Sequence, residues 1–316
     1  MARTAAWGPD DLPDLSGRTV VVTGANSGLG LEASSMLAGA GAPGVLACRD
    51  PGRAAAALAA IRAQHPRASV ETAALDLASL ASVRSFAEAF AGAHDRLDVL
   101  LNNAGVMAVP RRTTADGFEL QLGTNHLGHF ALTGLLLARL LAAPAARVVN
   151  VSSGAHKAGR MRFDDLQGEV RYGPWSAYGQ SKLANLLFTF ELERRLRASG
   201  ARATSVAAHP GYAATNLQFV GPRMSGSRAS ALLMSAMNRV LAQDARAGAL
   251  PLVYAAASPD AEGGGYFGPG GFAELWGAPK RVEASARARD RESAARLWQV
   301  SEALTGVRYE GLRAAA

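Results

Sequence analysis

Cysteine is almost absent from this chain, and its scarcity excludes two kinds of stabilising site. Cys48 is the only one, so no intramolecular disulfide can form and no zinc site can be built from several thiolates. The six histidines show no HExxH pattern. His126 and His129 are spaced for one helical face, but nothing near them in the sequence completes a metal shell. We therefore expect no metal site.

Long apolar runs are missing as well. The opening stretch MARTAAWGPDDLPDLSG contains no apolar run of about 7–15 residues, which a secretory signal needs. No segment reaches the roughly 18 uninterrupted apolar residues of a membrane-spanning helix, because His129 and Arg139 interrupt the nearest one, HFALTGLLLARLLAAPAARVV. We expect a cytoplasmic protein without a membrane span.

Lysine is the third scarce residue, with Lys157, Lys182 and Lys280 standing against thirty arginines. The net charge of +7 would suit a nucleic-acid partner, but the basic residues are dispersed. Their densest stretches, ERRLRASGAR and KRVEASARARDRES, are interleaved with acids and small residues. This pattern is typical of solvated helix faces rather than of phosphate-binding patches, so we expect no nucleic-acid partner.

What the sequence does contain is a regular alternation of short apolar runs and helical segments. Strands separated by helices of about 10–15 residues indicate βαβ units, and near-continuous apolar strands indicate a sheet covered on both faces. We predict an α/β fold with a single Rossmann-type, doubly wound parallel sheet of about seven strands and helices on both faces. The expected strands are 18–24, 44–48, 68–75, 97–105, 147–153 and 203–211, and the expected helices are 28–41, 52–64, 80–93, 117–142 and 175–199.

The domain organisation is simple, because no repeat and no Pro/Ser-rich linker divides the chain. We expect an N-terminal extension over 1–15 and a single domain over 16–316. The segment 213–245 breaks the alternation and is rich in Gly, Ser, Met and Arg. Because it leaves the carboxyl end of a strand, where ligands bind in such sheets, it is either a lid over a site or a surface connection.

The stretch TGANSGLG, 23–30, lies between the first strand and the first helix. Its glycines Gly24, Gly28 and Gly30 would let backbone N–H groups approach a pyrophosphate at the helix N-terminus. Their spacing is G-x-x-x-G-x-G rather than G-x-G-x-x-G, and a tight turn without a ligand is the alternative interpretation. The position after the first strand of a βαβ unit favours a dinucleotide site.

Three further clusters lie at expected strand ends or on an expected helix. NNAG ends the fourth strand at 102–105, VNVSS ends the fifth at 149–153, and Tyr178 and Lys182 lie four residues apart on one helical face. Each alone has an ordinary structural explanation. In this order along the chain, and followed by a Pro-Gly pair, they resemble the short-chain dehydrogenase/reductase superfamily over about residues 16–310.

Finer features resemble the retinol-dehydrogenase-like branch, namely NHLGHF, AYGQSKLANLLF and the 25-residue spacing between Ser153 and Tyr178. The resemblance implies an oxidoreductase that moves hydride between a nicotinamide cofactor and an alcohol/carbonyl pair. Tyr178 would be the general acid/base, and Lys182 would stabilise its phenolate and hold the nicotinamide ribose. Ser153, rather than Ser152, would bind the substrate oxygen. Asn125 would support a proton relay, unless it only satisfies helix backbone.

The same resemblance implies a set of cofactor contacts. Asp76 would contact the adenine, with capping of the next helix as its alternative role, and the Pro-Gly pair would form a turn over the nicotinamide. The implied residues are Gly24, Asn26, Ser27, Gly28, Leu29, Gly30, Arg49, Asp76, Leu77, Asn103, Ala104, Gly105, Tyr178, Lys182, Pro210, Gly211 and Thr215.

The residues after the second strand predict that NADP(H) is preferred over NAD(H). An acidic side chain there accepts hydrogen bonds from the ribose 2′-OH and repels a 2′-phosphate. By the resemblance this position is Cys48, which is neutral, and the next residue, Arg49, suits a phosphate. Asp50 follows one step later, where we expect it to cap the helix that begins near Pro51.

Several alternatives stay open at this point. A cofactor-binding sensor or scaffold without turnover is the alternative function, although the complete set of catalytic positions argues against it. A relative of the light-dependent protochlorophyllide reductases is disfavoured, because their chemistry is associated with a cysteine near the substrate and Cys48 ends the second strand. Apolar residues of 213–245 suggest a lipophilic substrate, but would equally suit an amphipathic helix. Both a monomer and a homodimer through 117–142 and 175–199 remain possible.

Overall fold

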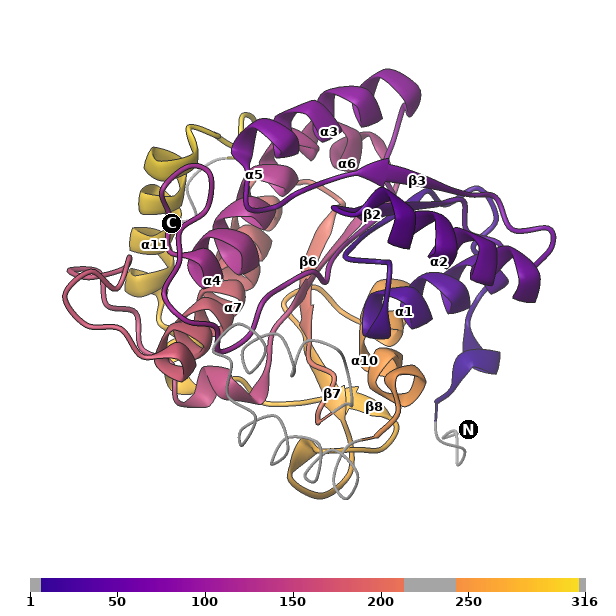
Figure 1. Cartoon of the computed structure of the whole chain (residues 1–316). Coiled ribbons are helices and arrows are strands. Elements are labelled where there is room, and N and C mark those ends of the chain that lie inside the picture. The colour runs from indigo at the N-terminus through magenta and orange to yellow at the C-terminus, as the bar shows by residue number, and fades with distance from the viewer. Residues whose placement is uncertain (1–6, 213–242, 313–316) are drawn as a thin grey trace.

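The computed structural model describes residues 7–212 and 243–312, and its centre is one eight-stranded sheet (Figure 1). The strands lie in the order β3-β2-β1-β4-β5-β6-β7-β8, and each neighbouring pair from β3 to β7 is parallel. The strands are β1 Val20–Thr23, β2 Gly44–Cys48, β3 Val70–Ala74, β4 Val99–Asn102, β5 Arg147–Val151, β6 Thr204–Ala208, β7 Tyr266–Pro269 and β8 Pro279–Arg281. The predicted α/β class and parallel sheet are thereby confirmed.

The number of strands differs from the expected value of about seven. The eighth strand is β8, which pairs with β7 in the antiparallel sense. It has only three residues, and two of them, Lys280 and Arg281, are exposed. Because the strand lacks the apolar run that marks a buried strand, its sequence gives no signal for it.

Helices cover both faces of the sheet. On one face α1, α2 and α10 pack around a core that includes Leu37, Ile61 and Leu252, and on the other α3, α5, α6 and α7 pack around Phe86, Phe130 and other residues (Figure 1). The helices are α1 Gly28–Gly39, α2 Pro51–Gln64, α3 Leu80–Ala93, α4 Leu120–Leu122, α5 Gly128–Leu135, α6 Leu137–Ala142, α7 Pro174–Ala198, α10 Ala245–Ala257 and α11 Arg291–Thr305.

The expected long helix 117–142 is divided in the structure. A π turn, η2 Gly123–Leu127, separates α4 from α5, and its last hydrogen bond runs from the Gly128 amide to the Gly123 carbonyl. Such a turn places one extra residue in the helix and is frequent at functional sites. A Cβ at Gly128 would lie 2.5 Å from the carbonyl oxygen of Leu77, so glycine lets this helix approach the end of β3 closely.

The C-terminal helix α11 packs on the outer side of α7 and α5. Trp298 of α11 is 2% exposed, and its ring centroid lies 5.2 Å from that of Phe130 and 5.9 Å from that of Phe188. The Tyr309 phenol donates to the carbonyl of Phe130 at 2.7 Å. A homodimer formed through the expected helices 117–142 and 175–199 would therefore have to use helix faces that α11 does not cover. The homodimer stays a prediction.

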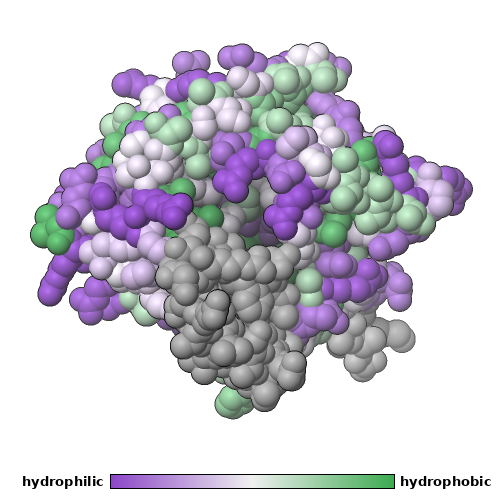
Figure 2. Space-filling view, in the orientation of Figure 1, coloured by the Kyte–Doolittle hydropathy of each residue, from purple (hydrophilic) through white to green (hydrophobic). Residues whose placement is uncertain are grey.

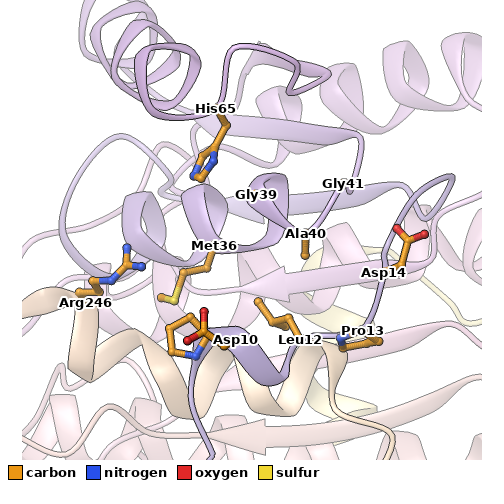
Figure 3. A pocket seen from close by; sticks show the side chains of 11 residues that line it. Asp10, Leu12, Pro13, Asp14, Met36, Gly39, Ala40, Gly41, His65 and Arg246 are labelled. Carbon is orange, nitrogen blue, oxygen red and sulfur yellow. The ribbon is translucent and has the colours of Figure 1, made fainter.

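Part of the expected extension 1–15 packs on the domain. The Trp7 ring lies edge-on to that of Tyr254 in α10, with centroids 5.1 Å apart, and Leu15 is buried. A cavity of about 520 Å³ lies between this segment and the C-terminal end of α1, with Asp14 and Arg246 in its lining (Figure 3). It is therefore at the opposite end of α1 from the glycine-rich turn.

The two arginine-rich stretches do not both form the solvated helix faces that their composition suggested. KRVEASARARDRES covers β8, the 3₁₀ turn η5 Ala286–Arg289 and only the start of α11. In ERRLRASGAR, at the end of α7, Arg195 pairs with the buried Glu191 at 2.7 Å and lies over the Trp298 ring. On the face shown in Figure 2, hydrophilic and apolar residues are interspersed. Within the described ranges, no helix is long and apolar enough to span a membrane.

Candidate active site

The strand order reverses at β1, which has β2 on one side and β4 on the other. In sheets of this kind, ligands bind at the carboxyl ends of the strands beside such a reversal. A cleft of about 360 Å³ lies there, and every cofactor position implied by the resemblance between Gly24 and Gly105 lines it. The structure thus brings together residues from four separate strand ends.

The glycine-rich turn has the geometry that its sequence indicates. Gly24 and Gly28 have φ values of +67° and +54°, which favour glycine. A Cβ at Gly30 would lie 2.6 Å from Nδ2 of Asn103, so the turn and the NNAG segment are in direct contact. The side chain of Ser27 does not cap α1, and a helix N-terminus of this kind suits an anion.

A second set of hydrogen bonds holds the NNAG segment against β1. The Thr23 hydroxyl oxygen accepts from the amides of Asn103 and Ala104 at 2.9 and 3.0 Å, and Asn103 Nδ2 donates to the Thr23 carbonyl at 2.8 Å. These contacts fix the two turns relative to each other in the lining of the cleft. This part of the cleft is therefore held in shape by hydrogen bonds within the protein.

The residues after β2 separate into buried and exposed positions. Cys48 is 3% exposed, and burial raises the pKa of its thiol to about 11 while the amides of Ala25 and Asn26 donate to the sulfur. Arg49 is exposed and lines the cleft. The residue that faces the cleft is thus the arginine, and the neutral cysteine lies beneath the glycine-rich turn.

Asp50 caps α2, as the sequence predicts. Its carboxylate accepts a hydrogen bond from the Arg53 amide at 3.0 Å. The Arg53 side chain also lines the cleft, and the sequence analysis missed it. The signal was present, because a residue four positions after Arg49, in the first turn of the expected helix, can reach the same anion.

Tyr178 and Lys182 lie on consecutive turns of α7 and are 4% and 3% exposed. The Lys182 ammonium donates to the Val151 carbonyl at 3.0 Å, and its nitrogen lies 5.7 Å from the centroid of the Tyr178 ring. Because Val151 ends β5, the lysine ties the helix to the carboxyl end of that strand. The pair is therefore buried and fixed at the sheet edge where ligands bind.

The structure distinguishes the two serines after β5. The Ser153 hydroxyl interacts with the Tyr178 phenol by a side-chain hydrogen bond, and its oxygen also accepts from the Ala155 amide at 3.2 Å. The Ser152 hydroxyl instead donates to the backbone carbonyl of Lys182 at 2.9 Å. Ser153 is thus the serine that lies beside the phenol.

Burial dominates the electrostatics of this pair. It raises the pKa of the Tyr178 phenol to about 12, against the lowering effect of the Ser153 hydrogen bond. It also lowers the pKa of the Lys182 ammonium to about 8. In the protein alone, the lysine therefore does not bring the phenol pKa towards neutrality, and the phenol keeps its proton at pH 7.

Asn125 lies inside the π turn and is fully buried. Its Oδ1 accepts from the Val106 amide at 2.8 Å, and its Nδ2 donates to the Val106 carbonyl at 2.9 Å and to the Ser181 hydroxyl at 2.9 Å. The asparagine thus holds the loop after NNAG rather than its own helix. A Cβ at Gly105 would lie 2.9 Å from Asn125 Oδ1 and 3.6 Å from Lys182 Nζ, so both side chains pack close to this glycine and leave no room for a larger residue.

His129 is a buried residue whose position in the sequence suggested only a candidate metal ligand. Its Nδ1 donates to the Asn125 carbonyl at 3.0 Å, and its Nε2 lies 2.9 Å from the Thr23 hydroxyl. Burial lowers its pKa to about 4 and keeps it neutral. It joins the π turn to the glycine-rich turn. Across residues 7–212 and 243–312, no group of three or more His, Cys, Asp or Glu side chains could hold a metal ion.

Asp76 and the Pro-Gly turn complete the predicted set. The Asp76 carboxylate accepts from the Ala78 amide at 3.0 Å, while α3 is capped by Ser79, so Asp76 does not cap that helix. Pro210 and Gly211 follow β6, the neighbour of β5. Thr215 and residues 213–242 of the expected lid lie outside the described residues.

The fold, the cleft and the buried Tyr178–Lys182 pair beside Ser153 define a nicotinamide-dependent oxidoreductase. Residues 18–220 match the family model of the short chain dehydrogenases, and the chain belongs to that family. Retinol dehydrogenase 12 of Homo sapiens is 43% identical over 300 residues, which cover 94% of this chain and 89% of that protein.

Two solved structures extend the comparison. A crystal structure of an uncharacterised protein from Mycobacterium paratuberculosis is 45% identical with a TM-score of 0.79, and the match covers 96% of this chain and 99% of the other. A Beutenbergia cavernae protein, assigned as an NAD(P)-dependent gluconate 5-dehydrogenase and holding NADP at low occupancy, is 27% identical with a TM-score of 0.60 over 82% of this chain and 96% of the other. The chain is thus an NAD(P)-dependent enzyme of the retinol-dehydrogenase-like branch that acts on alcohol/carbonyl groups.

Proposed function

We propose that this enzyme prefers NADP(H) and exchanges hydride with a lipophilic aldehyde or ketone and the matching alcohol. The observation that carries the cofactor preference is the pair Arg49 and Arg53, both in the lining of the cleft. The carboxylate of Asp50, which lies between them in the sequence and also lines the cleft, is engaged as the cap of α2. A guanidinium forms two parallel hydrogen bonds to a phosphate, whereas it offers no comparable contact to a ribose hydroxyl.

The residues of the cleft fit a dinucleotide. The uncapped N-terminus of α1 and the close approach at Gly30 suit a pyrophosphate, and Asp76 and Leu77 lie at the end of β3, where an adenine would bind. Lys182, Asn103, Ala104, Gly105, Pro210 and Gly211 would hold the ribose and nicotinamide end. When bound, the cofactor supplies the hydride for reduction or accepts it in oxidation.

The proton is handled by the side chains of the chain itself. In the reductive direction the Tyr178 phenol gives its proton to the substrate oxygen, which the Ser153 hydroxyl also binds. The high pKa of the phenol keeps this proton in place at pH 7. Lys182 then offsets the phenolate charge, and a proton taken up from solvent on the Asn125 side would pass through Lys182 to restore the phenol.

Three exposed aromatic side chains support a lipophilic substrate. Trp175 is 58% exposed, and its ring centroid lies 6.1 Å from that of Tyr178. Phe272 and Trp276 are exposed on the loop after β7, whose Glu274 contacts Lys157 in the turn that begins at Ser153. Exposed aromatic residues gathered near a catalytic group suit an apolar ligand.

The test is an activity screen with both cofactors, followed at the nicotinamide absorbance, over retinoid, steroid, fatty-aldehyde and quinone substrates. We expect turnover with NADPH and lipophilic carbonyls. If short hydroxy acids or sugars were turned over faster than lipophilic carbonyls, the proposed substrate class would be wrong. Tight cofactor binding with no turnover of any substrate would favour the sensor or scaffold.

We also propose that residues 16–316 form one catalytic domain.

A further inference from the structure

The loop between β7 and β8 has an unusual backbone. Ala273 and Glu274 have φ values of +50° and +59°, and the structure describes only one other non-glycine residue, Ala108, with positive φ. This region costs free energy for residues with a side chain and persists only where the surroundings hold it. The loop therefore needs contacts that hold this backbone conformation.

The Glu274 carboxylate contacts two basic side chains from different parts of the chain. Its Oε2 lies 3.3 Å from the ammonium nitrogen of Lys157 and 3.3 Å from Nε2 of His209. Lys157 ends the 3₁₀ turn η3 Gly154–Lys157, which Ser153 caps. His209 directly follows β6 and precedes the Pro-Gly turn. One carboxylate therefore joins the serine turn to the start of the Pro-Gly turn.

The protonation of His209 follows from its neighbours. The Gly211 amide donates to Nδ1 at 3.2 Å, and because an amide N–H can only donate, Nδ1 carries no hydrogen. The ring hydrogen is therefore on Nε2, the nitrogen that faces Glu274. Burial lowers the pKa of His209 to about 4, although Glu274 acts in the opposite direction, so the ring stays neutral near pH 7.

The Pro-Gly turn packs directly on the same loop. Gly211 has a φ of +67°, and a Cβ there would lie 2.7 Å from Cγ of Pro269 and 2.9 Å from the Glu274 carbonyl oxygen. The Tyr212 amide donates to the Leu275 carbonyl at 3.0 Å. The turn therefore takes its position from the loop. Backbone hydrogen bonds hold the loop, from Gly271 to Trp276 at 2.8 Å and from Gly270 to Ala278 at 2.7 Å, and the Glu274 side chain adds its contacts with Lys157 and His209.

We propose that Glu274 is a positioning residue, which fixes the Pro-Gly turn relative to the Ser153 turn through His209 and Lys157. The inference rests on the proposed function, in which the Pro-Gly turn binds the nicotinamide end of the cofactor. Glu274 itself contacts neither cofactor nor substrate. Its loss would loosen the nicotinamide end and leave the adenosine end of the cleft, formed by other strands, unchanged.

The experiment compares two ligands in the full-length protein. NADPH binds at both ends of the cleft, whereas 2′-phospho-ADP-ribose is the same molecule without the nicotinamide ring. For Glu274→Ala we expect NADPH affinity to fall on the order of tenfold, the scale of one charge-assisted hydrogen bond. Affinity for 2′-phospho-ADP-ribose should stay within about twofold, because its contacts lie elsewhere.

Two further variants and one control test which contact of Glu274 is responsible for the loss of affinity. Glu274→Gln keeps an acceptor for His209 and should recover much of the NADPH affinity, and Lys157→Met should show part of the loss. Glu283→Ala is the control, because Glu283 is an exposed acid paired with Arg289 at 3.1 Å. It should change neither affinity. Thermal unfolding of each variant checks that the fold is intact.

The outcomes separate the positioning role of Glu274 from the proposed use of the cofactor. Equal losses of both ligands in Glu274→Ala would mean general structural damage, and unchanged NADPH affinity would mean that Glu274 does not position the turn. Either result overturns the inference alone. If the parent protein binds neither ligand, the proposed cofactor use is wrong, and the inference fails with it.

Discussion

The ammonium nitrogen of Lys182 lies 5.7 Å from the centre of the Tyr178 ring and donates to the Val151 carbonyl rather than to the phenol. Both side chains are buried on α7, and burial moves their pKa values apart, to about 12 for the phenol and about 8 for the ammonium. Burial thus shifts each group towards its neutral form before a cofactor binds, although an ammonium with a pKa of about 8 is still mainly charged at pH 7. This relationship determines how the enzyme should respond to substitution and to pH.

Tyr178→Phe should abolish turnover and leave cofactor affinity almost unchanged, because the change removes only the hydroxyl that carries the proton. The measurements are kcat with a lipophilic aldehyde and the NADPH dissociation constant from fluorescence. A variant that kept half of the parent activity would show that another group is the acid.

The direction of the reaction should determine its pH dependence. Alcohol oxidation needs the phenolate, and the phenol pKa is raised to about 12, so the oxidation rate should rise from pH 7 to pH 10. Carbonyl reduction needs the protonated phenol and should not rise over this range. Initial rates in both directions test this. A fall in oxidation above pH 8 would instead indicate that the charge of Lys182, with its pKa of about 8, controls the rate.

The two serines after β5 provide a matched pair of variants. Ser153→Ala should lower the rate by about 10²–10³, the usual scale for removing a preorganised hydrogen-bond donor. Ser152→Ala should cost much less, because its hydroxyl donates to the backbone carbonyl of Lys182 and lies beside the phenol of Tyr266 rather than that of Tyr178. Single-turnover rates with NADPH make the comparison. The reverse order would show that the substrate oxygen lies beside Ser152.

The sequence predicted those parts of the site that follow from local motifs. Each of these motifs spans only a few residues: the glycine-rich turn, NNAG and the Tyr178–Lys182 pair. The strand or helix that carries a motif therefore also determines its position in the fold. The Glu274–His209 contact joins residues 65 positions apart and depends on two positive φ values, which no local pattern indicates. The π turn at Asn125 likewise follows from no local pattern, and Gly128, which ends it, packs against Leu77 from a distant part of the sequence.

The buried charge of Lys182 should lower the stability of the protein without cofactor. In the unfolded chain the ammonium pKa is near 10.5, and burial lowers it to about 8 in the folded state. The unfolded chain therefore holds more protons between pH 8 and pH 10.5, and this contribution to stability rises with pH over that window. At roughly 1.4 kcal/mol per pKa unit, the cost below pH 8 is about 3 kcal/mol.

Lys182→Met should remove that cost together with the activity. The Val151 carbonyl keeps a hydrogen bond from Asn185 at 3.0 Å, so the variant leaves no unpaired acceptor there. We expect the variant to be more stable than the parent at pH 7 and the difference to shrink towards pH 10. Urea unfolding of both proteins at the two pH values measures this. A difference that did not change with pH would mean that the ammonium is not destabilised by burial.

The cofactor preference should depend on Arg49 more than on any other side chain of the cleft. Arg49 and Arg53 both line it, but Arg49 directly follows β2, where the adenosine ribose of a dinucleotide lies in such folds. One charge-assisted contact contributes about 1.5–3 kcal/mol, or roughly 10–150-fold in affinity. Arg49→Ala should therefore weaken NADPH by about that factor and leave NADH little changed.

Arg53→Ala should show a smaller loss of the same kind, and Arg49→Lys should recover only part of the affinity, because an ammonium lacks the planar pair of donors. Asp50→Asn serves as the control. Its amide oxygen can still cap α2, and any repulsion of the phosphate is removed, so the variant should not weaken NADPH. The assay is kcat/KM for NADPH and NADH with one aldehyde. Equal values for the two cofactors in the parent protein would contradict the preference and would point to Asp50 as a ligand of the ribose hydroxyl.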